Sequence, residues 1–230
     1  MPNDPKILAL SIFFGIVPSV LWLFFWLSED KDHPEPKGVL ASVFFLGMMS
    51  VVFVLPVQKL ILSLVSNYNL QIIFWATAEE IIKYLAVVII VRKTFLIDEP
   101  VDWPIYLITS ALGFAALENA MFLLKPLSLN EATVGILTGQ LRFVGSTLLH
   151  TISSGILGVA LGLSMIKNKA KQKIYFLLGL LLAISLHSVF NFFIMNGAED
   201  NVMKTLAFLW ITAVVIMLLF EKLRRLSGQF

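Results

Sequence analysis

The sequence places pairs of side chains four residues apart inside segments that are otherwise apolar, and each pair contains a polar or ionisable group. Residues four apart share one face of an α-helix. Carboxylates, imidazoles and amides that converge on one point can activate water and stabilise a developing oxyanion. The pattern therefore predicts a hydrolytic site assembled from several helices. The pairs are Glu79 with Lys83, Phe114 with Glu118, His150 with Ser154, and His187 with Asn191.

The most costly of these groups lie in the segment QIIFWATAEEIIKYLAVVIIV, which contains Glu79, Glu80 and Lys83. A charge at the centre of a membrane-spanning helix costs about 2.5–3.5 kcal/mol, so these side chains must face each other or a wet cavity. Glu80 is turned by about 100° from Glu79 on a helix, so one glutamate can face the cavity while the other holds a neighbouring helix. We expect Glu79 to be the reactive carboxylate, with Glu80 as the alternative.

Water is the natural nucleophile for this set of residues. A glutamate in an apolar bundle can take a proton from water and later give it to a leaving amine. His187 and Asn191 could hold the oxyanion of a tetrahedral intermediate, while Glu118 and His150 orient the water or tune Glu79. The set predicts hydrolysis of a peptide bond within the membrane.

Other catalytic classes lack their residues. The chain has no cysteine, no H-E-x-x-H pair, no G-x-S-x-G elbow and no aspartate inside a predicted span. Zinc held by Glu79, His150 and His187 is allowed by ligand type. The spacing provides none of the usual ligand pairs, so we favour a site without a metal or other cofactor.

The elements that position these residues are membrane-spanning helices. The chain is 58% hydrophobic and 14% charged, against about 45–50% and 25% in soluble domains. We expect an all-α, polytopic transmembrane helical bundle that forms one domain over residues 1–230, with its motifs between 70 and 195. Spans need about 20 apolar residues, which predicts seven: 7–27, 38–62, 70–91, 104–124, about 135–166, 174–195 and 202–220.

The fifth span is over-long, so we expect a short interfacial helix before Arg142. Arg142 itself is expected to anchor at the outer interface or to bind a lipid phosphate, with binding of the substrate as the less favoured alternative.

The distribution of basic residues predicts the orientation. Eleven Lys and Arg residues fall in loops on one side and four on the other, so we expect the N-terminus outside and the C-terminus in the cytoplasm. With this orientation, Glu79, Glu118, His150 and His187 each lie ~10–13 Å from the outer end of a helix. They predict one site in the outer half of the membrane. The majority side contains Lys31, Lys37, Arg92, Lys93, Lys167, Lys169, Lys171, Lys173, Lys222, Arg224 and Arg225, and the other side contains Lys6, Lys59, Lys125 and Lys204.

Four motifs in order on successive predicted spans resemble those of the PrsW family of intramembrane proteases, relatives of the CAAX prenyl endopeptidases and of bacteriocin-processing enzymes. The motifs are E-E-x-x-K (Glu79, Glu80, Lys83), F-x-x-x-E-N (Phe114, Glu118, Asn119), H-x-x-x-S (His150, Ser154) and H-x-x-x-N (His187, Asn191). The prenyl endopeptidases carry a His where this chain has Glu118, which favours the PrsW branch and argues against a prenylated substrate.

The resemblance implies a glutamic-type endopeptidase, although the family is often labelled a metalloprotease. It implies the first cut in a single-pass membrane protein such as an anti-sigma factor, near its extracytoplasmic boundary, in a cell membrane. The alternative is a proton-coupled transporter or channel that uses the Glu, His and Lys cluster as a relay. We expect the partners to be the substrate and the lipid bilayer, and nothing in the net charge of +2 points to nucleic acid.

Overall fold

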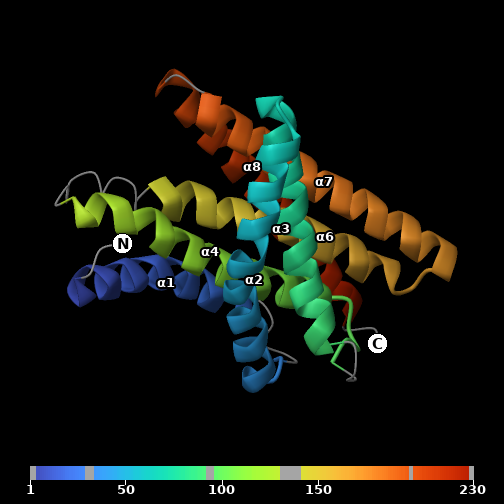
Figure 1. Cartoon of the computed structure of the whole chain (residues 1–230). Helices are drawn as coiled ribbons and strands as arrows, with labels where there is room; N and C mark the ends of the chain where they lie inside the picture. Colours follow the sequence, from blue (N-terminus) through green and yellow to red (C-terminus); the bar gives the residue numbers. More distant parts are fainter. Residues whose placement is uncertain (1–3, 29–33, 92–95, 130–140, 197–198, 228–230) are drawn as a thin grey trace.

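The computed structural model describes residues 4–28, 34–91, 96–129, 141–196 and 199–227, and all regular structure within these ranges is helical. This confirms the predicted all-α bundle (Figure 1). The elements are α1 (Pro5–Leu27), α2 (Lys37–Leu64), α3 (Tyr68–Val91), α4 (Asp102–Ser128), the π-helical turn η1 (Arg142–Ser146), α6 (Thr147–Ser164), α7 (Lys169–Asn196) and α8 (Glu199–Ser227).

Six helical segments in the described residues are long and apolar enough to cross a membrane: α1, α2, α4, η1 with α6, α7 and α8. Helix α3 has 24 residues, which is also sufficient length. It is not among these six because Glu79, Glu80 and Lys83 place three charged residues in its middle. The helix that departs from ordinary membrane composition is thus the one that carries the predicted reactive group.

Helix α4 lies at the centre of the molecule and packs against α1, α2 and α6. Small residues allow helix backbones to approach closely, and two glycines do so where α2 crosses α4. A Cβ added at Gly113 would lie 2.0 Å from the carbonyl oxygen of Phe44, and one at Gly47 would lie 2.2 Å from that of Ser110. The α2–α4 crossing therefore requires glycine on both helices.

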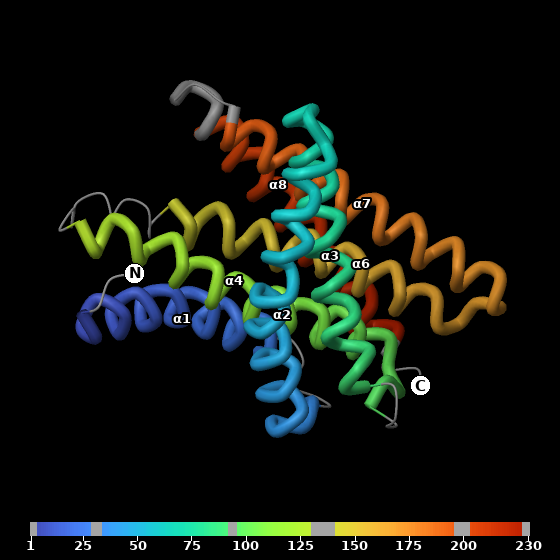
Figure 2. Tube along the Cα trace, viewed as in Figure 1, coloured from blue at the N-terminus to red at the C-terminus, as the bar shows by residue number. Residues whose placement is uncertain are grey.

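Helices α2 and α3 form an antiparallel hairpin that crosses the long direction of α1, α4 and α6 at a steep angle (Figure 2). Helix α3 also contacts α4, α6 and α7. The middle of α3 is therefore inside the bundle, where Glu79, Glu80 and Lys83 are buried.

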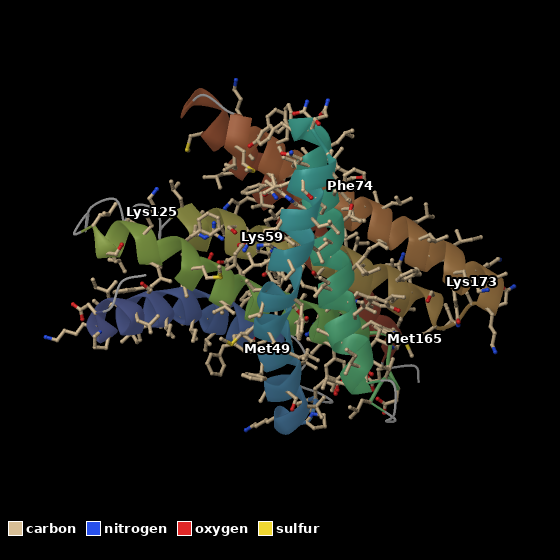
Figure 3. The ribbon with its side chains drawn as sticks, in the orientation of Figure 1. Met49, Lys59, Phe74, Lys125, Met165 and Lys173 are labelled. Carbon is tan, nitrogen blue, oxygen red and sulfur yellow. The ribbon has the colours of Figure 1, made fainter. Side chains whose placement is uncertain are left out.

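The positions of the helix ends agree with a chain that crosses the membrane back and forth. Lys125 near the end of α4 and Lys173 near the start of α7 lie at opposite ends of the molecule (Figure 3).

Large apolar side chains such as Phe24, Leu64 and Leu218 are exposed on the outer helices, as expected of a surface that faces lipid.

The predicted spans differ from the helices mainly at their ends, where the helices run a few residues longer. The fifth span is the exception, because its described part begins only at Leu141. The interfacial helix predicted before Arg142 falls on residues 130–140, outside the described residues.

Candidate active site

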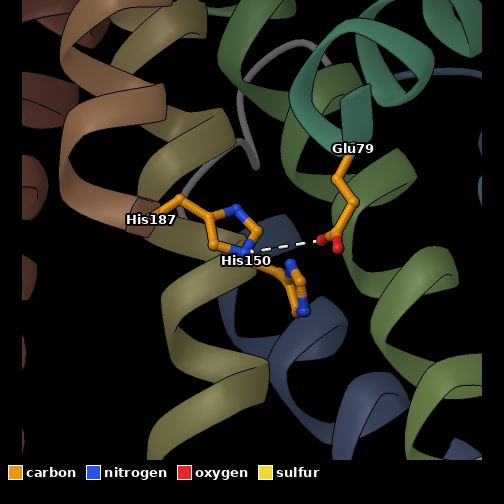
Figure 4. Close-up of side chains that lie close together, drawn as sticks. All are labelled: Glu79, His150 and His187. Atoms are coloured by element: carbon orange, nitrogen blue, oxygen red, sulfur yellow. Dashed lines mark ion pairs between the residues drawn. The ribbon is translucent and has the colours of Figure 1, made fainter. Parts of the chain in front are cut away.

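Three nearly inaccessible side chains from three helices meet inside the bundle. Glu79 of α3, His150 of α6 and His187 of α7 each present one donor atom, and these atoms lie within 4.8 Å of one another (Figure 4). Nε2 of His187 is 3.4 Å from Oε2 of Glu79. The structure thus brings together groups that the sequence separates by more than a hundred residues.

Glu80 is fully occupied by internal partners. Its Oε1 accepts from Nζ of Lys83 at 2.6 Å, from Nδ1 of His187 at 2.7 Å and from Oγ of Ser153 at 2.9 Å. Its Oε2 accepts from Oγ of Ser154 at 2.9 Å. Because these donors come from α3, α6 and α7, Glu80 holds three helices together.

Lys83 was expected to share a helix face with Glu79, four residues away, but the structure pairs it with Glu80, three residues away. Both spacings bring side chains together on a helix. Lys83 pairs with Glu80 because the Glu80 carboxylate faces α6. On α6, His150 also accepts a hydrogen bond from the Lys83 ammonium group, with 3.2 Å between Nζ and Nδ1.

Glu79 is much less satisfied than Glu80. Its Oε1 accepts one hydrogen bond, from Nε2 of Gln58 on α2 at 2.9 Å. Its Oε2 is buried and has no hydrogen-bond partner among the described residues. Buried polar atoms nearly always have partners, so an unpartnered carboxylate oxygen requires an explanation.

Both ring nitrogens of His150 are engaged. Since the Lys83 ammonium can only donate, Nδ1 must accept, and Nε2 therefore donates to Oε2 of Glu118 at 3.1 Å. The ring also packs against Phe114, with 5.2 Å between the ring centroids. His150 thus links the Glu80–Lys83 pair to Glu118 as a neutral imidazole.

Arg142 in the π-helical turn fixes Glu118 from the other side. Its guanidinium pairs with Glu118, donates from Nε to Oδ1 of Asn119 at 2.6 Å and from Nη2 to Oγ of Ser146 at 3.0 Å. It also lies over the ring of Phe122, 3.9 Å from its centroid. The side chains of Glu118 and Arg142 are 21% and 15% exposed, so this edge of the site is the more accessible one.

The structure leaves one predicted residue apart. Asn191 lies on α7 one turn beyond His187, is half-buried, and makes no side-chain hydrogen bond to another described residue.

Gln58 and Ser153 contact the site, and neither is among the residues predicted from the sequence. An amide inside the apolar part of α2 was the available signal for Gln58. Ser153 adjoins the predicted Ser154, but it is not four residues from His150 and so lies outside the predicted helix-face pairs.

The donor set also fits a divalent cation by type and proximity. Oε2 of Glu79 is unpartnered and faces Nε2 of His187, while Glu80 holds the other nitrogen of His187. A carboxylate in that position commonly orients a metal-binding histidine. His150 fits less readily, because an ion would displace one of the two contacts of its ring.

Residues 35–220 match the family described as PrsW family intramembrane metalloprotease. Proteins called Protease PrsW are also similar. The one from Oceanobacillus iheyensis is 27% identical over 87% of this chain and 91% of its own length. The one from Geobacillus kaustophilus is 27% identical over 79% and 78%, and that from Clostridioides difficile 25% identical over 79% and 77%. No solved structure matches the chain.

Proposed function

Because the chain belongs to the PrsW family of intramembrane metalloproteases, we propose that its buried cluster hydrolyses a peptide bond of a membrane protein substrate, with Glu79 as the general base. The observation that carries this role is the contrast between the two glutamates. Glu80 has four hydrogen-bond donors around it, whereas Oε2 of Glu79 has none among the described residues. A base must have a free oxygen for the proton that it accepts.

The contacts of His187 define the starting state. Its Nδ1 donates to Glu80, so in the neutral ring Nε2 carries a lone pair directed at Oε2 of Glu79. Two electron-rich atoms at 3.4 Å need a positive centre between them. A proton shared by Glu79 and His187 meets this need, and Glu80 stabilises the imidazolium that forms when His187 holds it.

Hydrolysis begins with the shared proton on His187, which leaves the Glu79 carboxylate ionised. Water attacks the scissile carbonyl carbon while Oε2 of Glu79 takes one of its protons. The imidazolium of His187 donates a hydrogen bond to the carbonyl oxygen as that oxygen becomes an oxyanion. Glu79 passes its proton to the amide nitrogen, the C–N bond breaks, and the amine leaves.

A second arrangement is favoured by the proximity of Glu79, His150 and His187 and by the metalloprotease description of the family. These three residues would hold a divalent cation such as zinc, which supplies a Lewis acid for the scissile carbonyl when bound. Glu80 would then fix the ring orientation of His187 through Nδ1.

We further propose that the substrate is a single-pass membrane protein of the anti-sigma-factor type, cut near its extracytoplasmic boundary. Support for a cut on that side comes from the basic loops, which predict that the N-terminus is outside, and from the partial exposure of the Glu118–Arg142 edge. With this orientation that edge faces the outer half of the membrane.

The test is cleavage of a panel of single-pass reporter peptides in proteoliposomes, with products identified by mass spectrometry. Glu79→Gln and His187→Ala should each abolish detectable cleavage while remaining folded. The control is Glu221→Gln on α8, where the glutamate pairs with Arg224 and Arg225 away from the site. This variant should cleave the reporters like the parent.

Chelation decides between the two arrangements. Cleavage that resists a chelator supports Glu79 as a base without metal, and cleavage that is lost and then restored by zinc supports the cation. Full activity of Glu79→Gln would overturn both. Proton transport by a preparation that cleaves no reporter would instead support the transporter alternative.

A further inference from the structure

Gln58 of α2 is the single hydrogen-bond donor to Glu79 among the described residues. Nε2 of Gln58 lies 2.9 Å from Oε1 of Glu79, while the other oxygen faces Nε2 of His187. The amide thus occupies one carboxylate oxygen and leaves the other in the site.

A second contact fixes Gln58 itself. Nε1 of Trp75, one helical turn before Glu79 on α3, donates to the backbone carbonyl of Gln58 at 3.4 Å. Trp75 and Glu79, four residues apart on α3, therefore bind the backbone and the side chain of the same α2 residue, and we call these two hydrogen bonds the clamp. The clamp sets the rotation of the Glu79 carboxylate relative to the α2–α3 hairpin.

The clamp is electrically neutral in a site otherwise surrounded by charge. The ionisable groups of the site come from α3, α4, η1, α6 and α7. Helix α2 contributes an amide there. An amide can direct a carboxylate without neutralising it, so the carboxylate keeps its capacity to accept a proton.

We propose that Gln58 is a positioning residue of the site: it holds Oε1 of Glu79 so that Oε2 is presented to His187 and to the attacking water. This inference rests on the proposed function of Glu79. It predicts an effect on the rate of the chemical step, because the substrate does not need to contact Gln58 for the carboxylate to be aligned.

The first test compares Gln58→Met, which keeps the length of the side chain and removes its donor, with Gln71→Met. Gln71 belongs to the same hairpin, and its amide donates to the carbonyl of Val65 at 2.6 Å, away from Glu79. Gln58→Met should lower kcat roughly ten- to hundredfold, the effect of one hydrogen bond to a charged group, with KM little changed. Gln71→Met should leave both constants near the parent values. Equal kinetics of the two variants would overturn the proposal.

Gln58→Glu provides a readout that a structural role would not move. A second carboxylate beside Glu79 disfavours its charged form, so the acidic limb of the pH–rate profile should move to higher pH. An unmoved limb in a variant of normal stability contradicts contact between the two side chains during turnover.

An infrared measurement keeps the inference separate from the proposed function. At acidic pH the C=O stretch of protonated Glu79 is identified by its loss in Glu79→Gln. That band should shift in Gln58→Met and stay in place in Gln71→Met, whether or not a reporter is cleaved. A band that shifts without any cleavage would retain the contact and reject the protease, and a band that does not shift would reject the role of Gln58.

Discussion

At the scale of single residues, two adjacent glutamates have opposite environments. Glu80 forms a fully buried ion pair with Lys83 at 2.6 Å and accepts hydrogen bonds from α6 and α7. Glu79 accepts one hydrogen bond and keeps an oxygen without a partner among the described residues. We therefore expect Glu80 to act mainly on stability and Glu79 mainly on catalysis.

Removing one partner of the buried pair should be costly. Glu80→Gln or Lys83→Met leaves an uncompensated charge inside the bundle, and each should lower the free energy of unfolding by about 3–5 kcal/mol. The double variant should recover part of this loss, because no charge is then left without its partner. Unfolding in detergent micelles measures the effect, with Glu79→Gln as the isosteric control that stays near the parent. Additive losses in the double variant would contradict the coupling.

At the scale of elements, the π-helical turn η1 positions Arg142 against α4. A π-turn widens the helix locally and is frequent at functional sites. Through Arg142, the turn holds Glu118, and Glu118 in turn contacts His150. The turn thereby connects the more exposed edge of the site to its buried histidines.

Arg142→Lys tests whether the fork of the guanidinium matters. Lysine can keep one contact with Glu118 but cannot also reach Asn119 in the same geometry. We expect cleavage to fall severalfold, equally in zwitterionic and anionic proteoliposomes. A loss confined to anionic vesicles would instead support the predicted binding of a lipid phosphate by Arg142.

The crossing of α2 over α4 depends on the absence of side chains at two glycines. Gly113→Ala would place a Cβ against the backbone of Phe44, which cannot move aside. It should destabilise the protein by about 1–3 kcal/mol. Gly38→Ala on α2, where a Cβ meets nothing within 4 Å, should be neutral or slightly stabilising. Equal unfolding of the two variants would show that α2 can shift without cost.

At the scale of the whole molecule, the orientation in the membrane decides on which side substrates are cut. The chain has no cysteine, so labelling of a single introduced cysteine reports which side of the membrane that position faces, without labelling at other positions. Lys125→Cys should react with a membrane-impermeant maleimide in intact cells, and Lys173→Cys only after permeabilisation. The reverse pattern would turn the predicted orientation around and move the Glu118–Arg142 edge to the cytoplasmic half.

Stability should also depend on pH through a group outside the spans. Burial raises the pKa of Glu35 above its ordinary value of 4.5, although the hydroxyl of Tyr106 on α4 donates to its carboxylate. The folded protein therefore binds this proton more tightly than the unfolded chain. The contribution to stability is full below pH 4.5 and is lost as pH rises through the folded pKa. Glu35→Gln should thus gain stability relative to the parent as pH rises, and parallel unfolding curves would contradict this.

The sequence by itself determined the class of structure and the type of chemistry. Long apolar segments fix helices in a membrane, since backbone groups in lipid must bond within their own segment. The cost of charge in lipid then requires Glu79, Glu80 and Lys83 to face the interior. Four-residue spacing and equal depth were sufficient to predict that His150 and His187 meet them.

Only the tertiary structure decided which partner each group takes. Residues 79 and 80 are neighbours in sequence, yet one contacts Gln58 of α2 and the other the serines of α6. Nδ1 of His187 reaches Glu80 from 107 residues away. Such pairings depend on how far each helix is rotated and how closely the helices cross. The rotation of each helix and the distance between crossing helices are set by contacts between backbones, as at Gly113. The periodicity of a single helix in the sequence cannot predict either quantity.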